Sequence, residues 1–150
     1  MKREDLLTRL ENSMLLMGKG LHEEQLGYPQ CSPAQNHVLM IIGIEGDLGI
    51  KQLAEMLRVT SGAATQHVDS LEKLGLVKRK MSSNDRREIV VEMTGKGKIA
   101  YQEMRRTKAR ILSEVFGELS DSELHTLVEL IEKVSRRYVK NREGAHGKIQ

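Results

Sequence analysis

The stretch that decides the fold runs from Ile50 to Thr94, IKQLAEMLRVTSGAATQHVDSLEKLGLVKRKMSSNDRREIVVEMT. Apolar residues at three- and four-residue steps predict two short helices, at 51–57 and between Thr60 and Gly75. After Gly75 the apolar period changes to two, which predicts strands at 76–80 and 88–93 with a polar, arginine-bearing tip between them. Two helices joined by a tight turn and followed by a β-hairpin are typical of a winged helix-turn-helix.

The second predicted helix has two faces of different character. The inward arc at 100° per residue contains Ala64, Val68, Leu71 and Gly75, with Leu74 on its flank. The opposite face carries small or hydrogen-bonding residues, namely Gly62, Ala63, Gln66, Asp69, Ser70 and Lys73. Such a face is small enough to enter the DNA major groove and polar enough to bind base edges or phosphates. Thr60 is the predicted N-cap, and Ser61 and Thr65 add hydroxyls beside a helix N-terminus that favours phosphate.

Positive charge is concentrated in the predicted hairpin. Residues 77–87 contain five Lys or Arg and one Asp, a net charge of +4, whereas the whole chain carries +3, so that everything else sums to −1. A localised basic patch is the electrostatic footprint expected where a protein contacts nucleic acid.

Residues between positions 53 and 97 recur in a recognisable order. They are Leu53-Ala54, Thr65, Leu71-Glu72, Gly75-Leu76-Val77, Arg79, Ser83, Asp85-Arg86-Arg87, Met93-Thr94 and Gly97. This pattern resembles the MarR family of transcriptional regulators, and the Asp-Arg-Arg group of the hairpin is its most specific part. The resemblance implies a mainly α (α+β) protein, with a winged helix-turn-helix core and long N- and C-terminal dimerisation helices.

Roles for individual residues follow from this resemblance. Residues 61–73 would lie in the major groove of double-stranded DNA. The hairpin, here called the wing, would place an arginine of its tip in the minor groove, with Arg87 favoured and Arg86 next. Asp85 would hold a wing arginine by a charge-assisted bond, and Arg79 completes the expected DNA-binding set. The family further implies a homodimeric transcriptional regulator, usually a repressor, that is released from a promoter by a ligand.

Composition and motifs narrow the class of protein. At 17.0 kDa, with 39% hydrophobic and 30% charged residues, residues 1–150 are expected to form a single domain of a soluble helical protein. The chain has one cysteine, no membrane-length apolar run and no signal-peptide pattern, so we expect a cytoplasmic protein without a membrane partner. It shows no nucleophile elbow, phosphate-binding Gly-rich loop or paired-carboxylate site, so we expect neither enzymatic activity nor a cofactor.

Long amphipathic helices are predicted on both sides of the winged core, at about 3–26, 97–117 and 120–142. So small a core cannot bury all their apolar faces, so we expect a second copy of the chain to cover them. The expected division is a winged core at 33–97, a helical dimerisation region at 1–32 and 98–142, and a flexible tail at 143–150. Two-fold symmetry would place the recognition helices about 34 Å apart on a pseudo-palindromic operator.

Capping signals mark three helix starts. Ser32 with Gln35 and Ser120 with Glu123 have the spacing of capping boxes, and Pro33 occupies the first helical position of the former. Thr94 is the predicted cap of the helix that follows the wing.

Two alternatives concern the segment 24–37. Cys31 precedes a predicted helix N-terminus, where a thiolate is favoured, and some members of the resembled family sense oxidants through one cysteine. The other interpretation of Cys31 is an inert, partly buried thiol. Glu24, Cys31 and His37 are acceptable zinc ligand types, but a closed site needs four ligands, so we expect no metal site.

The resembled family also suggests an effector site. Many of its members bind small aromatic or phenolic acids in a cleft between the dimer helices and the winged core. Met14, Met17, Met40 and Met104 could line such a cleft, because methionine is an adaptable wall, although plain core positions are the other interpretation. A final alternative is a winged-helix protein-interaction module, which would keep its partner after loss of Arg86 and Arg87.

Overall fold

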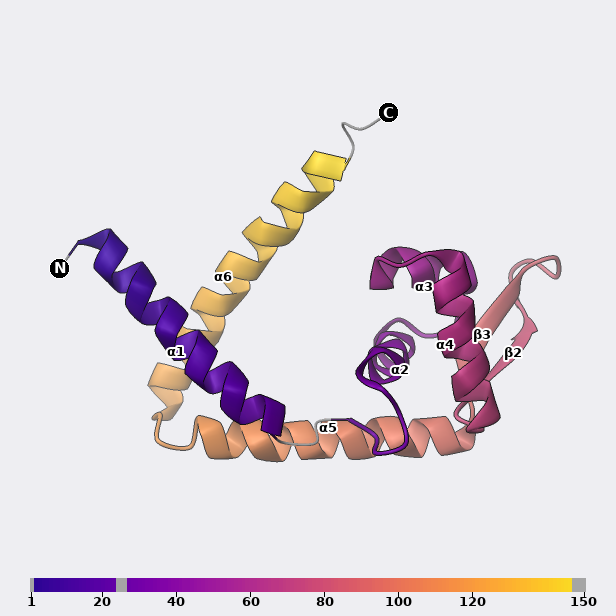
Figure 1. Cartoon of the computed structure of the whole chain (residues 1–150), viewed down its shortest axis with the longest axis horizontal. Helices are drawn as coiled ribbons and strands as arrows, with labels where there is room; N and C mark the ends of the chain where they lie inside the picture. The colour runs from indigo at the N-terminus through magenta and orange to yellow at the C-terminus, as the bar shows by residue number, and fades with distance from the viewer. Residues whose placement is uncertain (1, 24–26, 147–150) are drawn as a thin grey trace. The chain divides into compact units, whose positions relative to one another are not determined.

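The computed structural model describes residues 2–23 and 27–146, with side chains described for 2–19 and 27–138. The chain divides into two compact units, Met1–Lys108 and Ala109–Gln150. In the described part it is mainly helical with one small sheet, as predicted (Figure 1). The elements are α1 (Arg3–Glu23), α2 (Pro33–Glu45), β1 (Leu48–Gly49), α3 (Ile50–Leu57), α4 (Ser61–Lys73), β2 (Val77–Met81), β3 (Ile89–Met93), α5 (Gly95–Val115) and α6 (Asp121–His146).

The predicted capping boxes are confirmed. The backbone N–H of Ser32 donates to Gln35 Oε1 at 2.8 Å and that of Gln35 donates to Ser32 Oγ at 3.2 Å, with Pro33 at the first helical position of α2. At the start of α6, the backbone N–H of Ser120 donates to Glu123 Oε2 at 2.9 Å. These bonds satisfy backbone groups that a helix end otherwise leaves unpaired, which fixes where both helices begin.

The sheet has three antiparallel strands in the order β1-β3-β2. β1 is too short for its period to be visible in the sequence, and it was not predicted. Ile89, Val91 and Met93 alternate along β3 and so lie on one side of the strand, but Ile89 is 57% exposed, whereas Val91 and Met93 are buried. β1 pairs with β3 only at Val90 and Val91, so Ile89 lies beyond the three-stranded part, opposite Met81 at the outer end of the hairpin.

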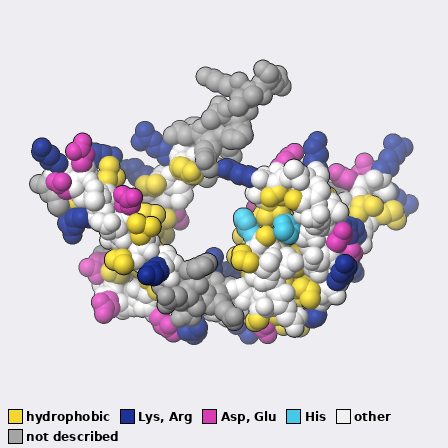
Figure 2. Space-filling model, in the orientation of Figure 1, with side chains coloured by type: hydrophobic (Ala, Val, Ile, Leu, Met, Phe, Trp, Pro, Cys, Tyr) yellow, Lys and Arg dark blue, Asp and Glu magenta, His cyan; other side chains and the backbone are white. Residues whose placement is uncertain are grey.

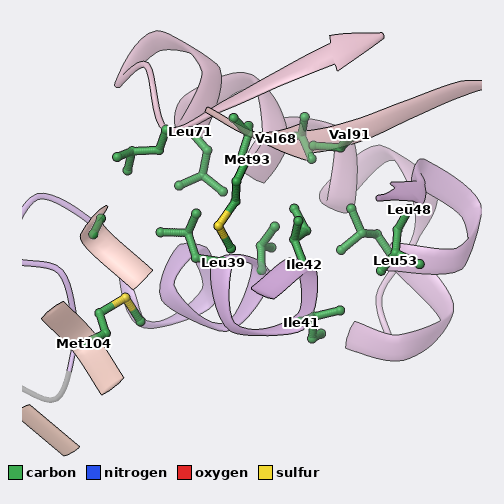
Figure 3. Close-up of a cluster of buried hydrophobic side chains, with 14 residues drawn as sticks. Leu39, Ile41, Ile42, Leu48, Leu53, Val68, Leu71, Val91, Met93 and Met104 are labelled. Carbon is green, nitrogen blue, oxygen red and sulfur yellow. The ribbon is translucent and has the colours of Figure 1, made fainter. Parts of the chain in front are cut away.

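The core joins helices α2, α3 and α4 to one face of the sheet and to the start of α5. In Figure 3, Leu39 and Ile42 of α2 point toward Val68 and Leu71 of α4 and toward Met93 of β3. Leu39, Val68 and Leu71 are fully buried, as the inward arc of the second predicted helix requires. Removing one of these leucine side chains would cost roughly 2–5 kcal/mol of stability, so the core holds α4 and the hairpin on one scaffold.

The junction between the wing and α5 is tightly packed. Thr94 caps α5 as predicted, because its Oγ1 accepts from the backbone N–H of Gly97 at 3.1 Å, although α5 already begins at Gly95. The same hydroxyl donates to the carbonyl of Gly75, at 2.6 Å. A Cβ at position 97 would overlap the backbone carbonyl of Leu76, so only glycine lets α5 approach the segment that enters β2.

The helices outside the winged core leave apolar side chains exposed. Leu6, Leu10 and Met14 of α1 are 49%, 56% and 59% exposed, and Ile131 and Val134 of α6 are 53% and 68% exposed. The described part of α1 ends at Glu23, and residues 24–26 of the predicted helix lie outside the described residues. α6 runs to His146, beyond the predicted end at Arg142, and 147–150 are not described. Among the described helices, none combines the length and the hydropathy needed to cross a bilayer.

Candidate nucleic-acid interface

The turn between α3 and α4 presents the start of α4 to solvent. Arg58 ends α3 in the left-handed conformation, with φ 57°, and so turns the chain between the two helices. Thr60 then caps α4 as predicted, its side-chain oxygen accepting from the backbone N–H of Ala63 at 3.1 Å. Ser61 and Gly62 are exposed. The positive end of the α4 dipole is therefore accessible to an anion such as phosphate.

The outer face of α4 contains the residues that the sequence placed there. Ser61, Gly62, Gln66 and Lys73 are exposed, and Ala63, Thr65, Asp69 and Ser70 are partly exposed. The Thr65 hydroxyl donates to the carbonyl of Ser61 at 2.8 Å, and the Ser70 hydroxyl donates to that of Gln66 at 3.0 Å. Both hydroxyls can accept a bond from a base, but donating to a phosphate would cost these bonds. Ser61, Gln66 and Lys73 therefore have the side chains most available to a ligand.

The tip of the wing is shaped by Asp85. Its carboxylate accepts from the backbone N–H of Arg87 at 2.9 Å, while its carbonyl accepts from the N–H of Glu88 at 3.0 Å. The charge-assisted bond expected from Asp85 is thus made to the main chain of a wing arginine. Arg86 and Arg87 are both exposed, and within the described residues neither guanidinium forms an ion pair. The tip therefore offers two unneutralised cations on a defined turn.

Arg79 lies in a different environment from the tip arginines. Its Nη2 is 2.6 Å from Asp69 Oδ1, and its Nη1 donates to Glu72 Oε2. The Arg79 side chain is only 27% exposed. These contacts, the hydrogen bond to Asp69 first among them, raise the pKa of Arg79 above its usual value. The sequence grouped Arg79 and Asp69 with the DNA-binding residues, whereas the structure pairs them with each other between α4 and β2.

The two wing lysines are also paired. Lys80 Nζ is 2.7 Å from Asp47 Oδ2 and contacts Glu92, and Lys78 Nζ is 3.0 Å from Glu92 Oε1. Hydrogen bonds to Asp47 and then to Glu92 raise the pKa of Lys80, and hydrogen bonds from Lys80 and then Lys78 lower the pKa of Glu92. Exposed pairs of this kind contribute little stability each, but they offset much of the hairpin's positive charge.

The partners of these cations were not identified from the sequence. Glu92 faces Lys78 in the hairpin register, a pairing that follows once the two strands are aligned. Asp47 lies before β1, and Glu72 lies on α4, so only the tertiary fold brings them to the wing. Figure 2 shows the result, with basic and acidic side chains interspersed over the region that holds α4 and the hairpin.

Cys31 has an environment that favours the neutral thiol. It is partly buried and packs against the core, with its backbone N–H donating to the carbonyl of Tyr28 at 2.9 Å. Burial raises the pKa of the Cys31 thiol, and the charge of Lys96 opposes this only in part. The expected preference for thiolate next to a helix N-terminus is therefore outweighed by desolvation.

The zinc alternative gains nothing from the described residues. His37 is exposed on α2, and Glu24 lies outside the described residues. In the part of the chain that the structure describes, no three His, Cys, Asp or Glu side chains gather closely enough to hold a metal ion.

The four methionines proposed for an effector cleft lie in different surroundings. Met104 is buried in the core and Met40 packs against it, whereas Met14 and Met17 of α1 are 59% and 41% exposed. Met104 also borders a shallow recess of about 380 Å³, together with Tyr28, Glu103 and other side chains of its rim. Met104 is therefore the one member of this set at the edge of a described recess.

A helix-turn-helix followed by a basic-tipped hairpin, built on one core, is a winged helix-turn-helix, an arrangement found in DNA-binding proteins. The model of the MarR family matches residues 31–89. The chain is 28% identical over 136 residues to the HTH-type transcriptional repressor MdtR of Bacillus subtilis, covering 89% of this chain and 88% of MdtR. A solved MarR family protein from Bacillus stearothermophilus superimposes with a TM-score of 0.79 at 22% identity, covering 93% of this chain and 99% of that protein.

A second solved structure has the same fold and includes a ligand. It is Streptococcus pneumoniae FabT in complex with DNA, with a TM-score of 0.65 at 21% identity, covering 91% of this chain and 94% of FabT. Over residues 31–89 the chain is thus similar to the MarR family, and the relative MdtR that it matches in sequence is a transcriptional regulator.

Proposed function

We propose that this protein is a homodimeric repressor that binds a pseudo-palindromic operator, with α4 in the major groove and the wing in the minor groove. The observation that carries the proposal is the pair of exposed arginines, Arg86 and Arg87, at the end of a hairpin that is fastened to α4. Narrow minor grooves attract arginine through their negative potential. The exposed start of α4 supplies the polar side chains and helix dipole that suit the adjacent major groove.

The DNA complex of FabT and the repressor name of MdtR support the same direction. In this chain, the DNA-contacting set would be led by Ser61, Gln66 and Lys73 on α4 and by Arg86 and Arg87 on the wing. Thr60, Gly62, Ala63, Thr65 and Ser70 would contribute shape, backbone groups and hydrogen-bond acceptors.

The dimer part of the proposal rests on the exposed apolar faces of α1 and α6. Leu10, Met14, Ile131 and Val134 are each more than half exposed in the single chain. Burial of apolar surface contributes roughly 25 cal/mol per Å², so a second copy that covers these faces would stabilise both chains.

The decisive experiment is selection of bound sequences from a random duplex library with the purified protein at near-physiological salt. We expect an enriched pseudo-palindrome whose half-sites lie about one helical turn apart. The affinity for the selected duplex should fall steeply as salt increases, because phosphate contacts release counterions. Absence of enrichment, with a protein that is folded and dimeric, would overturn the operator proposal and favour a protein-interaction module.

Ligand response is tested separately from DNA binding. Small aromatic and phenolic acids are added to the complex with the selected duplex, and release of DNA is measured together with the thermal midpoint of the protein. An effector binds the free protein more tightly than the DNA-bound form, so it should both release DNA and raise the midpoint. Failure of every such acid to change either quantity would remove this chemical class from the proposal.

A further inference from the structure

Arg79 joins the recognition helix to the wing at a point where the chain itself provides only a short turn. Its guanidinium holds Asp69 at 2.6 Å and also holds Glu72, and its backbone N–H donates to Glu72 Oε1 at 3.1 Å. Both acids belong to α4 and the arginine belongs to β2. One residue therefore makes three polar contacts across the junction of the two elements that would bind DNA.

The charges of this group argue against a phosphate contact. Arg79 carries one positive charge and its two partners carry two negative charges, so the group as a whole is acidic. Because the guanidinium already donates from both Nη groups to carboxylates, few of its donors remain for a phosphate. Diffuse electrostatics from the group would repel DNA, in contrast to the unneutralised arginines at the tip.

The position of the group gives it a mechanical role. Between α4 and β2 the chain turns at Gly75, with φ 72°, and the core holds the base of the hairpin. Arg79 follows two residues into β2 and adds an attachment on the side of α4. β1 already holds one edge of the hairpin through its pairing with Val90 and Val91 of β3. β2 is the other edge of the sheet, and Arg79 fixes it to α4, so that the hairpin is held on both sides.

We propose that Arg79, held by Asp69 and Glu72, is a positioning residue that sets the direction of the wing, so that α4 and Arg87 reach adjacent grooves of the same duplex. The inference rests on the proposed function. In this proposal Arg79, Asp69 and Glu72 set the geometry of the DNA-binding surface, and other residues make the contacts with DNA.

The substitution Glu72→Gln distinguishes positioning from electrostatics by its sign. Removing an acid near DNA strengthens binding if charge alone matters. If the acid positions the wing, the same change weakens binding to the selected duplex, by roughly tenfold on the scale of coupled neighbouring residues. Glu88→Gln is the matched control, because Glu88 is an exposed acid of the hairpin outside the group of Arg79, Asp69 and Glu72. This change should leave the affinity for the duplex unchanged or higher. Tighter binding by Glu72→Gln would overturn the proposal.

Arg79→Lys provides a second discrimination. Lysine is a point charge that can serve a phosphate but cannot span two carboxylates as the guanidinium fork does. Arg79→Lys should therefore lose affinity nearly as much as Arg79→Ala. Near wild-type binding by Arg79→Lys, with weak binding by Arg79→Ala, would identify a phosphate contact instead.

Footprints locate the effect. Hydroxyl-radical cleavage reports minor-groove and backbone protection, and dimethyl sulfate reports guanine N7 in the major groove. For Glu72→Gln and for Asp69→Asn, we expect protection to be lost at the wing positions and retained at the α4 positions, as in Arg87→Ala. Uniform loss of both protections would overturn the positioning role.

Two controls separate the possible failures. Thermal unfolding and sedimentation show whether each variant is folded and has the assembly of the wild type. If the wild type itself gives no minor-groove protection, the proposed wing contact is wrong. That result differs from one in which the wild type protects the minor groove and the variants of Asp69 and Glu72 protect it equally, which would contradict the positioning role of Arg79. A double variant, Glu72→Gln with Arg87→Ala, should bind no worse than Arg87→Ala alone, whereas additive losses would mean that Glu72 acts independently of the wing.

Discussion

The five basic side chains of the hairpin differ in what they can do. Their number and clustering were readable from the sequence, and so was the preference for Arg86 and Arg87. The pairing of the other three was not. Asp47, Asp69 and Glu72 lie on other elements that only the fold brings to the hairpin, and the pair Lys78–Glu92 follows only once the strand register is known. Charge counting therefore overstated the free positive charge of the hairpin while identifying its tip correctly as exposed.

Arg87→Ala should weaken binding to the selected duplex and reduce the slope of log K against log salt by about 1, since one phosphate neutralisation is lost. Lys78→Ala is the matched control, because the Lys78 ammonium is paired with Glu92. The slope of log K against log salt should change less for Lys78→Ala than for Arg87→Ala. Titration of labelled duplex at several salt concentrations measures both. Equal slopes for Arg87→Ala and the wild type would contradict a role in phosphate or minor-groove contact.

The thiol of Cys31 should react slowly. Its pKa is raised by burial, so at neutral pH less of it is thiolate than in an exposed cysteine. The rate of modification by a thiol reagent should therefore keep rising with pH past the point where a cysteine peptide levels off. Peroxide should not release DNA from the wild type any more than from Cys31→Ser. Fast modification at neutral pH would revive the redox alternative.

At the scale of elements, the long and strongly patterned segments were predicted well. The caps at Ser32, Thr60, Thr94 and Ser120 were all identified, because capping depends on residues only a few positions apart. β1 was missed, since two residues form a strand only when β3 lies beside them. The exposure of Ile89 could not be predicted either, because alternation predicts the face of a residue but not where the neighbouring strand stops.

The ion pairs of the hairpin should make its stability depend on acid. Contacts with Lys80 and Lys78 lower the pKa of Glu92 in the folded state. A depressed carboxyl pKa contributes stability that is present above the unfolded pKa and lost as pH falls through the folded one. The difference in free energy of unfolding between the wild type and Glu92→Gln should therefore shrink as pH falls through the acidic range. Urea unfolding at a series of pH values measures it, and a constant difference would contradict the pairing.

At the scale of the whole molecule, the sequence indicated more apolar helical surface than one small core can bury. The exposed faces of α1 and α6 agree with that count. No single chain reveals the partner that covers them, because the covering side chains would come from another molecule. The effector is a similar case, since methionines at helical spacing are as suitable for a core as for a cleft, and Met104 proved to be a core residue.

Assembly can be tested on α6 with a matched pair of substitutions. Ile131→Asn removes an apolar side chain that is 53% exposed in the single chain, and Lys133→Asn changes an exposed polar position of the same helix. If a second copy covers the apolar face, Ile131→Asn should shift the protein toward monomer in sedimentation, and Lys133→Asn should not. The wild-type thermal midpoint should also rise with protein concentration. A monomeric wild type would contradict the proposed homodimer.

The close approach of α5 to the segment entering β2 predicts a pattern of mutational tolerance. In a library that places every amino acid at every position, selected only for folded protein, position 97 should accept glycine alone, because any Cβ there meets the carbonyl of Leu76. The tip of the wing should accept almost anything under the same selection. Under selection for repression, position 97 and the wing tip should both tolerate few residues. Comparing the two selections then shows that position 97 is restricted by main-chain crowding and the tip by its contact with the operator.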